Sequence, residues 1–146
     1  MSGGRLRVIL ARMTPPGDRP GTLIIGSPIE RSELFRLTAA HFEGMVKFVV
    51  DLERRRIAIG GQMHVDLEER LLADGSTKAH LWGANYYPGR GPEGCIEYTS
   101  LINVSPSRGN LSMEIKDPGL RERIRTIAFA LIGSGQEDRW PPGTPG

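Results

Sequence analysis

The side chains that could do chemistry gather on either side of a glycine-rich stretch, residues 88–94. The flanking segments are aromatic and β-branched, which is typical of two antiparallel strands joined by a loop. In such a hairpin Asn85 lies opposite Glu97. Two residues further along, Gly83 lies opposite Thr99 on the same face. A carboxylate, an amide and a hydroxyl beside a glycine that admits close approach predict a site for a polar ligand.

Further residues extend this predicted ligand site. Asn103 falls on the same face, and Arg90 lies in the loop. The aromatic rings nearby could also stack on bases, as they do in single-strand binders. The predicted ligand-binding residues are Trp82, Asn85, Tyr87, Thr99, Asn103 and Arg90. The competing interpretation is a solvated sheet face, because antiparallel sheets commonly expose one side to water.

A divalent metal is the one cofactor that the sequence suggests. His64 and Asp66 are two residues apart, and with Glu97 they could supply nitrogen and oxygen ligands. Asp66 is explained more simply as the N-cap of a helix. Cys95 is the only cysteine of the chain, which excludes an intramolecular disulfide and a cage of cysteine ligands.

The same side chains could instead act without a metal. His64 and Glu97 would serve as acid and base in the cleavage of a phosphodiester, with Arg108 stabilising the transition state. The glycine-rich segments 88–94 and 105–110 could bind phosphate through backbone amides, although neither matches a known nucleotide-binding motif. The competing interpretations are a plain surface histidine and two ordinary turns.

The elements that must position these residues are indicated by capping and periodicity. Ser27 and Glu30 form a capping-box pattern, which predicts a first helix from residue 28 that ends near His41. Residues 45–52 and 56–60 are rich in valine and isoleucine and are separated by a polar break. They predict a pair of strands.

Two further helices are expected. Asp66 and Glu69 form a second capping-box pattern, and the Asp74-Gly75 pair ends this short helix. Asp117, followed by proline, begins a third helix whose apolar stripe continues to the glycine at 133. The predicted order of elements is helix, hairpin, short helix, hairpin and helix. This order predicts an α+β fold. We expect a roughly four-stranded antiparallel sheet of two hairpins with helices packed on one face.

The chain of 146 residues fits a single domain. We expect this domain at residues 22–133, a flexible basic leader at residues 1–21 and a disordered tail rich in proline and glycine at residues 134–146. No apolar run is long enough to span a membrane, and no signal peptide is recognisable, so we expect a cytoplasmic protein that does not bind membranes. A homodimer is one expected arrangement.

The basic charge of the chain lies before the expected domain. Residues 1–29 hold four arginines against one aspartate, a net of +3, whereas the whole chain carries +2. The rest is therefore close to neutral, without the basic stripe of a nucleic-acid binder. Nucleic acid is not the expected partner. The alternative that remains is a nucleic-acid adaptor that binds through the basic leader, residues 1–21.

Four sequence blocks resemble a known family. They are Ala58-Ile-Gly-Gly-Gln-Met-His-Val-Asp, Leu81-Trp-Gly-Ala-Asn-Tyr-Tyr-Pro, Glu97-Tyr-Thr-Ser-Leu-Ile-Asn-Val-Ser-Pro and the helix after Asp117. In this order and spacing they resemble a prokaryotic family called domain of unknown function 5674, over roughly residues 28–133. The resemblance implies one compact domain and assigns no activity.

The sequence therefore leaves two classes of function open. One is a non-catalytic module that binds a small polar ligand or a protein partner through the face of Asn85, Glu97 and Thr99. The other is a small hydrolase that uses Glu97 and His64 in acid/base or divalent-metal chemistry.

Overall fold

The hairpin of β2 (Val46–Asp51) and β3 (Arg56–Gly60) is central in the computed structural model, which describes residues 21–137. The two strands pair antiparallel, with Val49 opposite Ala58. At the turn, the buried Asp51 carboxylate accepts the backbone N–H groups of Glu53 and Arg54, both at 2.9 Å. The predicted strand pair is confirmed, and its turn is stabilised by this carboxylate.

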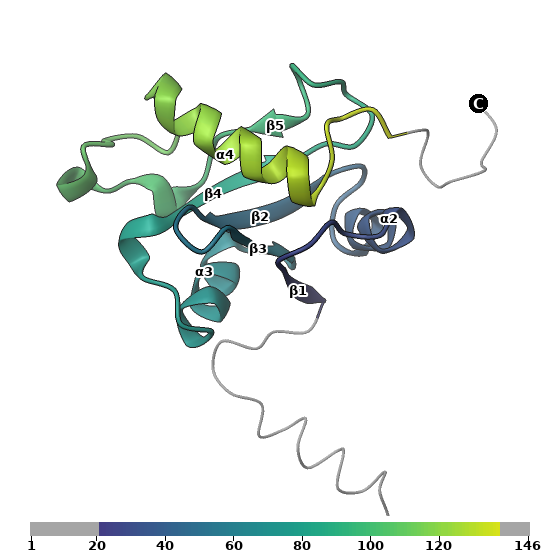
Figure 1. Ribbon diagram of the computed structural model, residues 1–146, viewed down its shortest axis with the longest axis horizontal. Coiled ribbons are helices and arrows are strands. Elements are labelled where there is room, and N and C mark those ends of the chain that lie inside the picture. The colour runs from purple at the N-terminus through teal and green to yellow at the C-terminus, as the bar shows by residue number, and fades with distance from the viewer. Residues whose placement is uncertain (1–20, 138–146) are drawn as a thin grey trace, which may run out of the picture.

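The sheet has five antiparallel strands in the order β1-β3-β2-β4-β5 (Figure 1). The additional strand is β1 (Thr22–Ile25), which pairs with β3 along the edge of the first hairpin. The remaining strands are β4 (Leu81–Tyr86) and β5 (Ile96–Glu97). The α+β class is confirmed. The expected count of four strands was one too low, because the four residues of β1, three of them apolar, are too short a run to show a strand period.

Helices cover both faces of the sheet, so the prediction of helices on one face is wrong. Helices α2 (Arg31–Ala40) and α4 (Pro118–Leu131) contribute to the larger core cluster, which includes Phe48. Helix α3 (His64–Ala73) packs on Val49 on the opposite face. Figure 1 shows α4 crossing in front of β4 and β2. A strand buried on both faces, such as β2, shows no apolar/polar alternation, so its pattern could not indicate which face a helix covers.

The predicted starts of two helices are also corrected. Helix α2 begins at Arg31 rather than at residue 28, because the N–H of Ile29 donates to the carbonyl of Leu131 at 2.9 Å instead of entering the helix. Helix α3 begins at His64, so Asp66 lies in its first turn and is not its cap. A carboxylate in the first turn still stabilises the helix, because its negative charge interacts favourably with the helix dipole.

The start of α4 is confirmed. The Asp117 carboxylate caps the helix by accepting the N–H of Leu120 at 3.1 Å, and Pro118 occupies the first turn.

The second hairpin is shorter than expected. Asn85 pairs with Glu97 as predicted, but β5 ends at Glu97. Thr99 does not lie opposite Gly83 and instead forms a bridge with Glu114. The predicted strand therefore gives way to a loop.

A side chain occupies the position beside β4 that the predicted strand would have filled. Asn103, in the short 3-10 helix η2 (Leu101–Asn103), accepts the N–H of Gly83 at 2.8 Å and donates to its carbonyl at 2.9 Å. These two bonds reproduce those of a strand pair through one amide. Asn103 is fully buried, so it is a structural residue and not the ligand-binding residue that was predicted.

The described residues extend past the predicted end of the domain at residue 133. The predicted leader lies outside the described residues except for Gly21, and residues 138–146 of the predicted tail also lie outside them. Residues 134–137 are held in place, because the N–H of Gly135 donates to the Tyr86 hydroxyl at 2.8 Å and that hydroxyl donates to Glu137 at 2.6 Å. The predicted disorder is wrong for these four residues. Each helix within residues 21–137 is too short or too polar to span a lipid bilayer.

Candidate functional site

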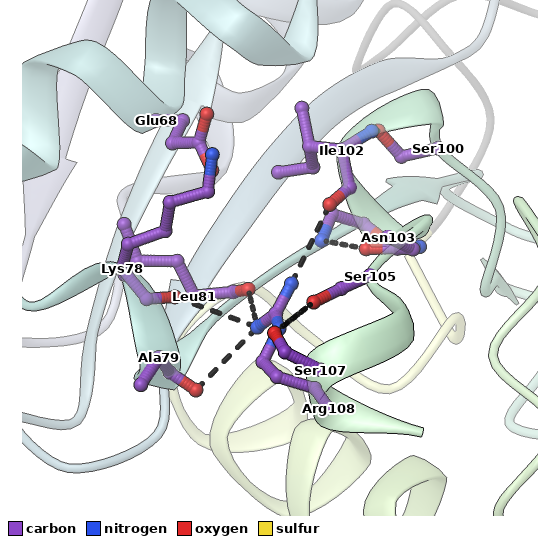
Figure 2. A network of polar contacts seen from close by, with 11 residues as sticks. Glu68, Lys78, Ala79, Leu81, Ser100, Ile102, Asn103, Ser105, Ser107 and Arg108 are labelled. Carbon is purple, nitrogen blue, oxygen red and sulfur yellow. Dashed lines mark hydrogen bonds and ion pairs between the residues drawn. The ribbon is translucent and has the colours of Figure 1, made fainter. Parts of the chain in front are cut away.

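A groove of about 640 Å³ lies on the α3 face of the sheet, between α3 and the loop of residues 99–113. Its walls include His64 and Glu68 from α3, together with Ser100 and Ile102 from the loop. Figure 2 shows Glu68 and Lys78 close together, with Ser100 and Ile102 across from them. Asn85 and Thr99, two of the predicted ligand-binding residues, also line the groove.

Gly83 serves packing within the protein and not the approach of a ligand. A Cβ atom added to Gly83 would lie 2.8 Å from both Cβ and Oγ of Ser100 and 3.2 Å from Cδ2 of His64. Carbon atoms do not approach this closely, so a glycine is needed where Ser100 and His64 cover β4. The predicted open approach at Gly83 is therefore filled by these two side chains.

His64 is buried, so the interpretation as a plain surface histidine is wrong. Its Nε2 atom lies 2.8 Å from the carbonyl oxygen of Ala84, and because a carbonyl can only accept, Nε2 carries the proton. Burial lowers the pKa of His64 to about 4, although the Ala84 carbonyl acts in the opposite direction. The ring is therefore neutral near pH 7, and its Nδ1 atom carries no proton.

Asn85 and Glu97 are joined beside the groove, as the predicted register requires. The Asn85 amide and the Tyr87 hydroxyl both donate to Oε1 of Glu97, each at 2.9 Å. Asn85 and Glu97 also lie near enough to raise the pKa of His64. However, Oδ1 of Asn85 is buried and accepts no hydrogen bond from residues 21–137.

Glu68 is a groove residue that the sequence analysis missed. The residue is 5% exposed, and Oε2 accepts no hydrogen bond from the described part of the chain. Lys78 Nζ lies 3.8 Å from this oxygen, too far for a hydrogen bond. A buried acceptor without a donor costs about 1–3 kcal/mol. The missed signal was an acidic residue four positions after His64, on the side of α3 that also carries Leu71.

The other predicted catalytic and binding residues lie elsewhere. The Arg108 guanidinium donates to the carbonyl of Leu81 at 2.8 Å (Figure 2). It also stacks on the Trp82 ring at 3.7 Å. Burial lowers the pKa of Arg108. Arg108 thus holds its loop against β4, and Trp82, at 5% exposure, cannot stack on a base. Arg90 stacks on Tyr87 at 4.0 Å, away from the groove lining.

The predicted metal ligands are not assembled. Within residues 21–137, no group of three or more histidine, cysteine, aspartate or glutamate side chains is arranged to hold a metal ion. The prediction placed His64 and Asp66 before a helix, whereas both lie in the first turn of α3. Side chains two residues apart on a helix point in different directions, which separates these two.

Apolar side chains form the rim of the groove. Seven large hydrophobic side chains of residues 21–137 are exposed, and five of them line this groove. The five are Met63, Val65, Leu101, Val104 and Met113. Met63 is 56% exposed and Leu101 is 72% exposed. These exposed apolar side chains are therefore concentrated on one surface of the described part of the chain.

Comparison with known proteins now identifies the family. The family model described as protein of unknown function (DUF5674) matches residues 23–131, about three quarters of the chain. The chain belongs to the DUF5674 family. This confirms the resemblance found in the sequence blocks. No curated protein matches the chain, and no solved structure does.

The groove of this DUF5674 domain combines a neutral histidine with apolar side chains and buried acceptors. All of the residues that line it fall within the matched range 23–131. His64, with a pKa of about 4 and Nε2 bound to Ala84, is a poor proton acceptor near pH 7. What the groove offers is an apolar rim and two buried acceptors, on Asn85 and Glu68.

Proposed function

We propose that this DUF5674 protein is a non-catalytic binding module whose ligand occupies the groove between α3 and residues 99–113. One observation carries the proposal: five of the seven exposed large hydrophobic side chains of residues 21–137 line this groove. Scattered single exposed apolar residues need no explanation, whereas their concentration in one concave surface does.

The two buried acceptors add support of a different kind. A folded protein rarely leaves buried polar atoms without partners, and exceptions are commonly associated with function. Oδ1 of Asn85 and Oε2 of Glu68 are buried atoms of two residues that both line the same groove. A ligand that donates hydrogen bonds to these atoms would remove the free-energy cost of leaving them without donors in the unbound protein.

A small hydrolase remains the alternative, and one observation favours it. His64, Asn85 and Glu97 are close enough to influence one another electrostatically. Against it, Arg108 is occupied by Leu81 and Trp82, so the predicted transition-state stabiliser is not free. Glu97→Gln tests this alternative, because turnover of a phosphodiester that disappears in a folded variant would favour the hydrolase.

A fragment screen by nuclear magnetic resonance tests the binding module directly. The full-length, 15N-labelled protein would be titrated with a library of small amines, amides and carboxylic acids that carry apolar groups. We expect amide shifts to cluster at His64, Asn85 and Leu101. Leu101→Asp should abolish them, whereas Leu111→Asp should not, because Leu111 is 78% exposed and lies outside the groove lining. Shifts that cluster elsewhere, or equal losses in both variants, would contradict the proposal.

A further inference from the structure

Two residues of the groove lining each carry a buried oxygen that receives no hydrogen bond from residues 21–137, which indicates which chemical groups a ligand must have. Both atoms, Oδ1 of Asn85 and Oε2 of Glu68, are hydrogen-bond acceptors, and both are buried. A ligand group that reaches them must therefore donate hydrogen bonds. A carboxylate or phosphate would place further acceptors against them and would be rejected.

The acceptor on Glu68 also selects for positive charge. The Glu68 side chain is 7% exposed, and Nζ of Lys78 lies 3.8 Å from Oε2 on a side chain that is 69% exposed. Because Lys78 is mostly exposed and its Nζ atom is too far from Oε2 for a hydrogen bond, a cation that comes closer can replace it. A basic group on a ligand could instead form a short, charge-assisted hydrogen bond to Oε2.

The exposed apolar side chains of the rim indicate the size of the ligand that carries this basic group. Met63 precedes α3 and Leu101 lies in η2, and both remain more than half exposed. A small molecule that sank to the buried acceptors would leave these rim side chains in water. A polypeptide segment could cover both of them and still send a long basic side chain downward. Two copies of this chain cannot pair groove to groove, because a concave surface does not complement itself.

We propose that the ligand is a polypeptide segment of another protein that carries a lysine or arginine side chain between apolar residues. The basic end of that side chain reaches Glu68 and Asn85, and its apolar neighbours cover the rim. This inference rests on the proposed function, since it specifies the ligand of the same groove. The recognition mode is a hydrophobic docking site with one charged anchor.

The test begins with a selection of random 12-residue peptides on phage against the full-length protein. Enriched peptides would be synthesised, and their Kd values measured by fluorescence polarisation against the wild type, Glu68→Gln, Leu101→Asp and Leu111→Asp. We expect the enriched peptides to share a lysine or arginine flanked by apolar residues. Glu68→Gln should weaken binding at least tenfold, Leu101→Asp should abolish it and Leu111→Asp should leave it unchanged.

A double-mutant cycle then tests the contact itself. The basic residue of the peptide would be replaced by norleucine or citrulline, which removes the charge and keeps the size. If the basic side chain reaches Glu68, the replacement should weaken binding to the wild type but should have little effect on Glu68→Gln. Thermal unfolding of Glu68→Gln, which keeps the size of the side chain, checks that the variant is folded.

The outcomes separate this inference from the proposed function. Peptides that need Leu101 but bind equally well with norleucine would overturn the basic anchor and leave the binding groove intact. Peptides that bind Leu101→Asp as tightly as the wild type would overturn the groove as their site. If no peptide is enriched, the polypeptide ligand is wrong, and the fragment screen decides independently whether the groove binds anything.

Discussion

The first residue of α3, His64, donates a hydrogen bond from Nε2 to the backbone carbonyl of Ala84 in β4, over 2.8 Å. This bond joins the helix to the sheet on the face that carries the groove. The bond fixes the proton on Nε2, whereas burial lowers the pKa of the imidazole to about 4 and keeps the ring neutral. The geometry of the groove thus depends on a titratable side chain.

We predict that lowering the pH destabilises the protein through His64. Its pKa falls from an ordinary 6.5 to about 4 on folding, so the unfolded chain binds more protons between these values. The free energy of unfolding should therefore fall as the pH decreases from 6.5 to 4, by up to about 3 kcal/mol. Urea unfolding at pH 7 and at pH 4 measures it.

The control for this prediction is a second histidine. His64→Gln should remove most of the pH dependence, whereas His41→Gln, at an exposed position, should keep it. Equal pH dependence in the wild type and His64→Gln would show that other groups govern acid stability.

Gly83→Ala should lower the free energy of unfolding by about 1–3 kcal/mol, because overpacking forces neighbours to move. The added Cβ would meet Ser100 at 2.8 Å. Gly119→Ala is the matched control, since its Cβ would meet the Asp117 carboxylate at an ordinary 3.7 Å in α4. Chemical denaturation compares the two. A Gly83→Ala variant as stable as the control would mean that Ser100 and His64 do not pack on β4 in this way.

Two buried acidic residues should respond in opposite ways to removal of their charge. Asp51 accepts hydrogen bonds from Glu53, Arg54 and Ser76, so Asp51→Asn should destabilise the fold by roughly 2 kcal/mol. Oε2 of Glu68 accepts none from residues 21–137. Glu68→Gln should leave stability unchanged or raise it by up to about 1 kcal/mol.

Urea unfolding of both variants at pH 7 provides the comparison. Stabilisation at Glu68 together with weaker peptide binding would identify a residue kept for recognition at the expense of stability. A large loss of stability in Glu68→Gln would instead indicate a structural role.

Truncation should show that the domain extends beyond Gly133. The Tyr86 hydroxyl is bound by Gly135 and Glu137, and burial raises the pKa of Tyr86 well above its usual range. A chain that ends at Gly133 leaves this hydroxyl without these partners and should unfold about 1–3 kcal/mol more easily than a chain that ends at Glu137. Equal midpoints in thermal unfolding of the two chains would contradict this.

Local patterns predicted the parts of the fold that depend on neighbouring residues. The Asp117 cap and the stripe of α4 are set within one helix, and the pairing of Asn85 with Glu97 follows from the loop length. The face that α3 covers could not be predicted, because β2 is buried on both sides. Nor could the end of β5, since it depends on Asn103 binding a strand twenty residues earlier.

The candidate site was predicted in part for the same reason. Asn85, Thr99 and His64 were recognised as polar residues in strands and near a helix start, and they do line the groove. Glu68 was missed because its burial becomes visible only when α3 lies on the sheet. The rim was missed because Met63 and Leu101 are distant in sequence and meet only across the groove.

The side-chain amide of Asn103 also protects the protein against aggregation through the edge of its sheet. Beyond the two residues of β5, the backbone of β4 at Gly83 would present an open row of hydrogen-bonding groups. An open strand edge invites pairing with strands of other molecules and so promotes aggregation. Because Asn103 already binds both backbone groups of Gly83, a foreign strand finds no partner at that position. One side chain therefore limits growth of the sheet, while the groove between α3 and residues 99–113 stays available to a partner.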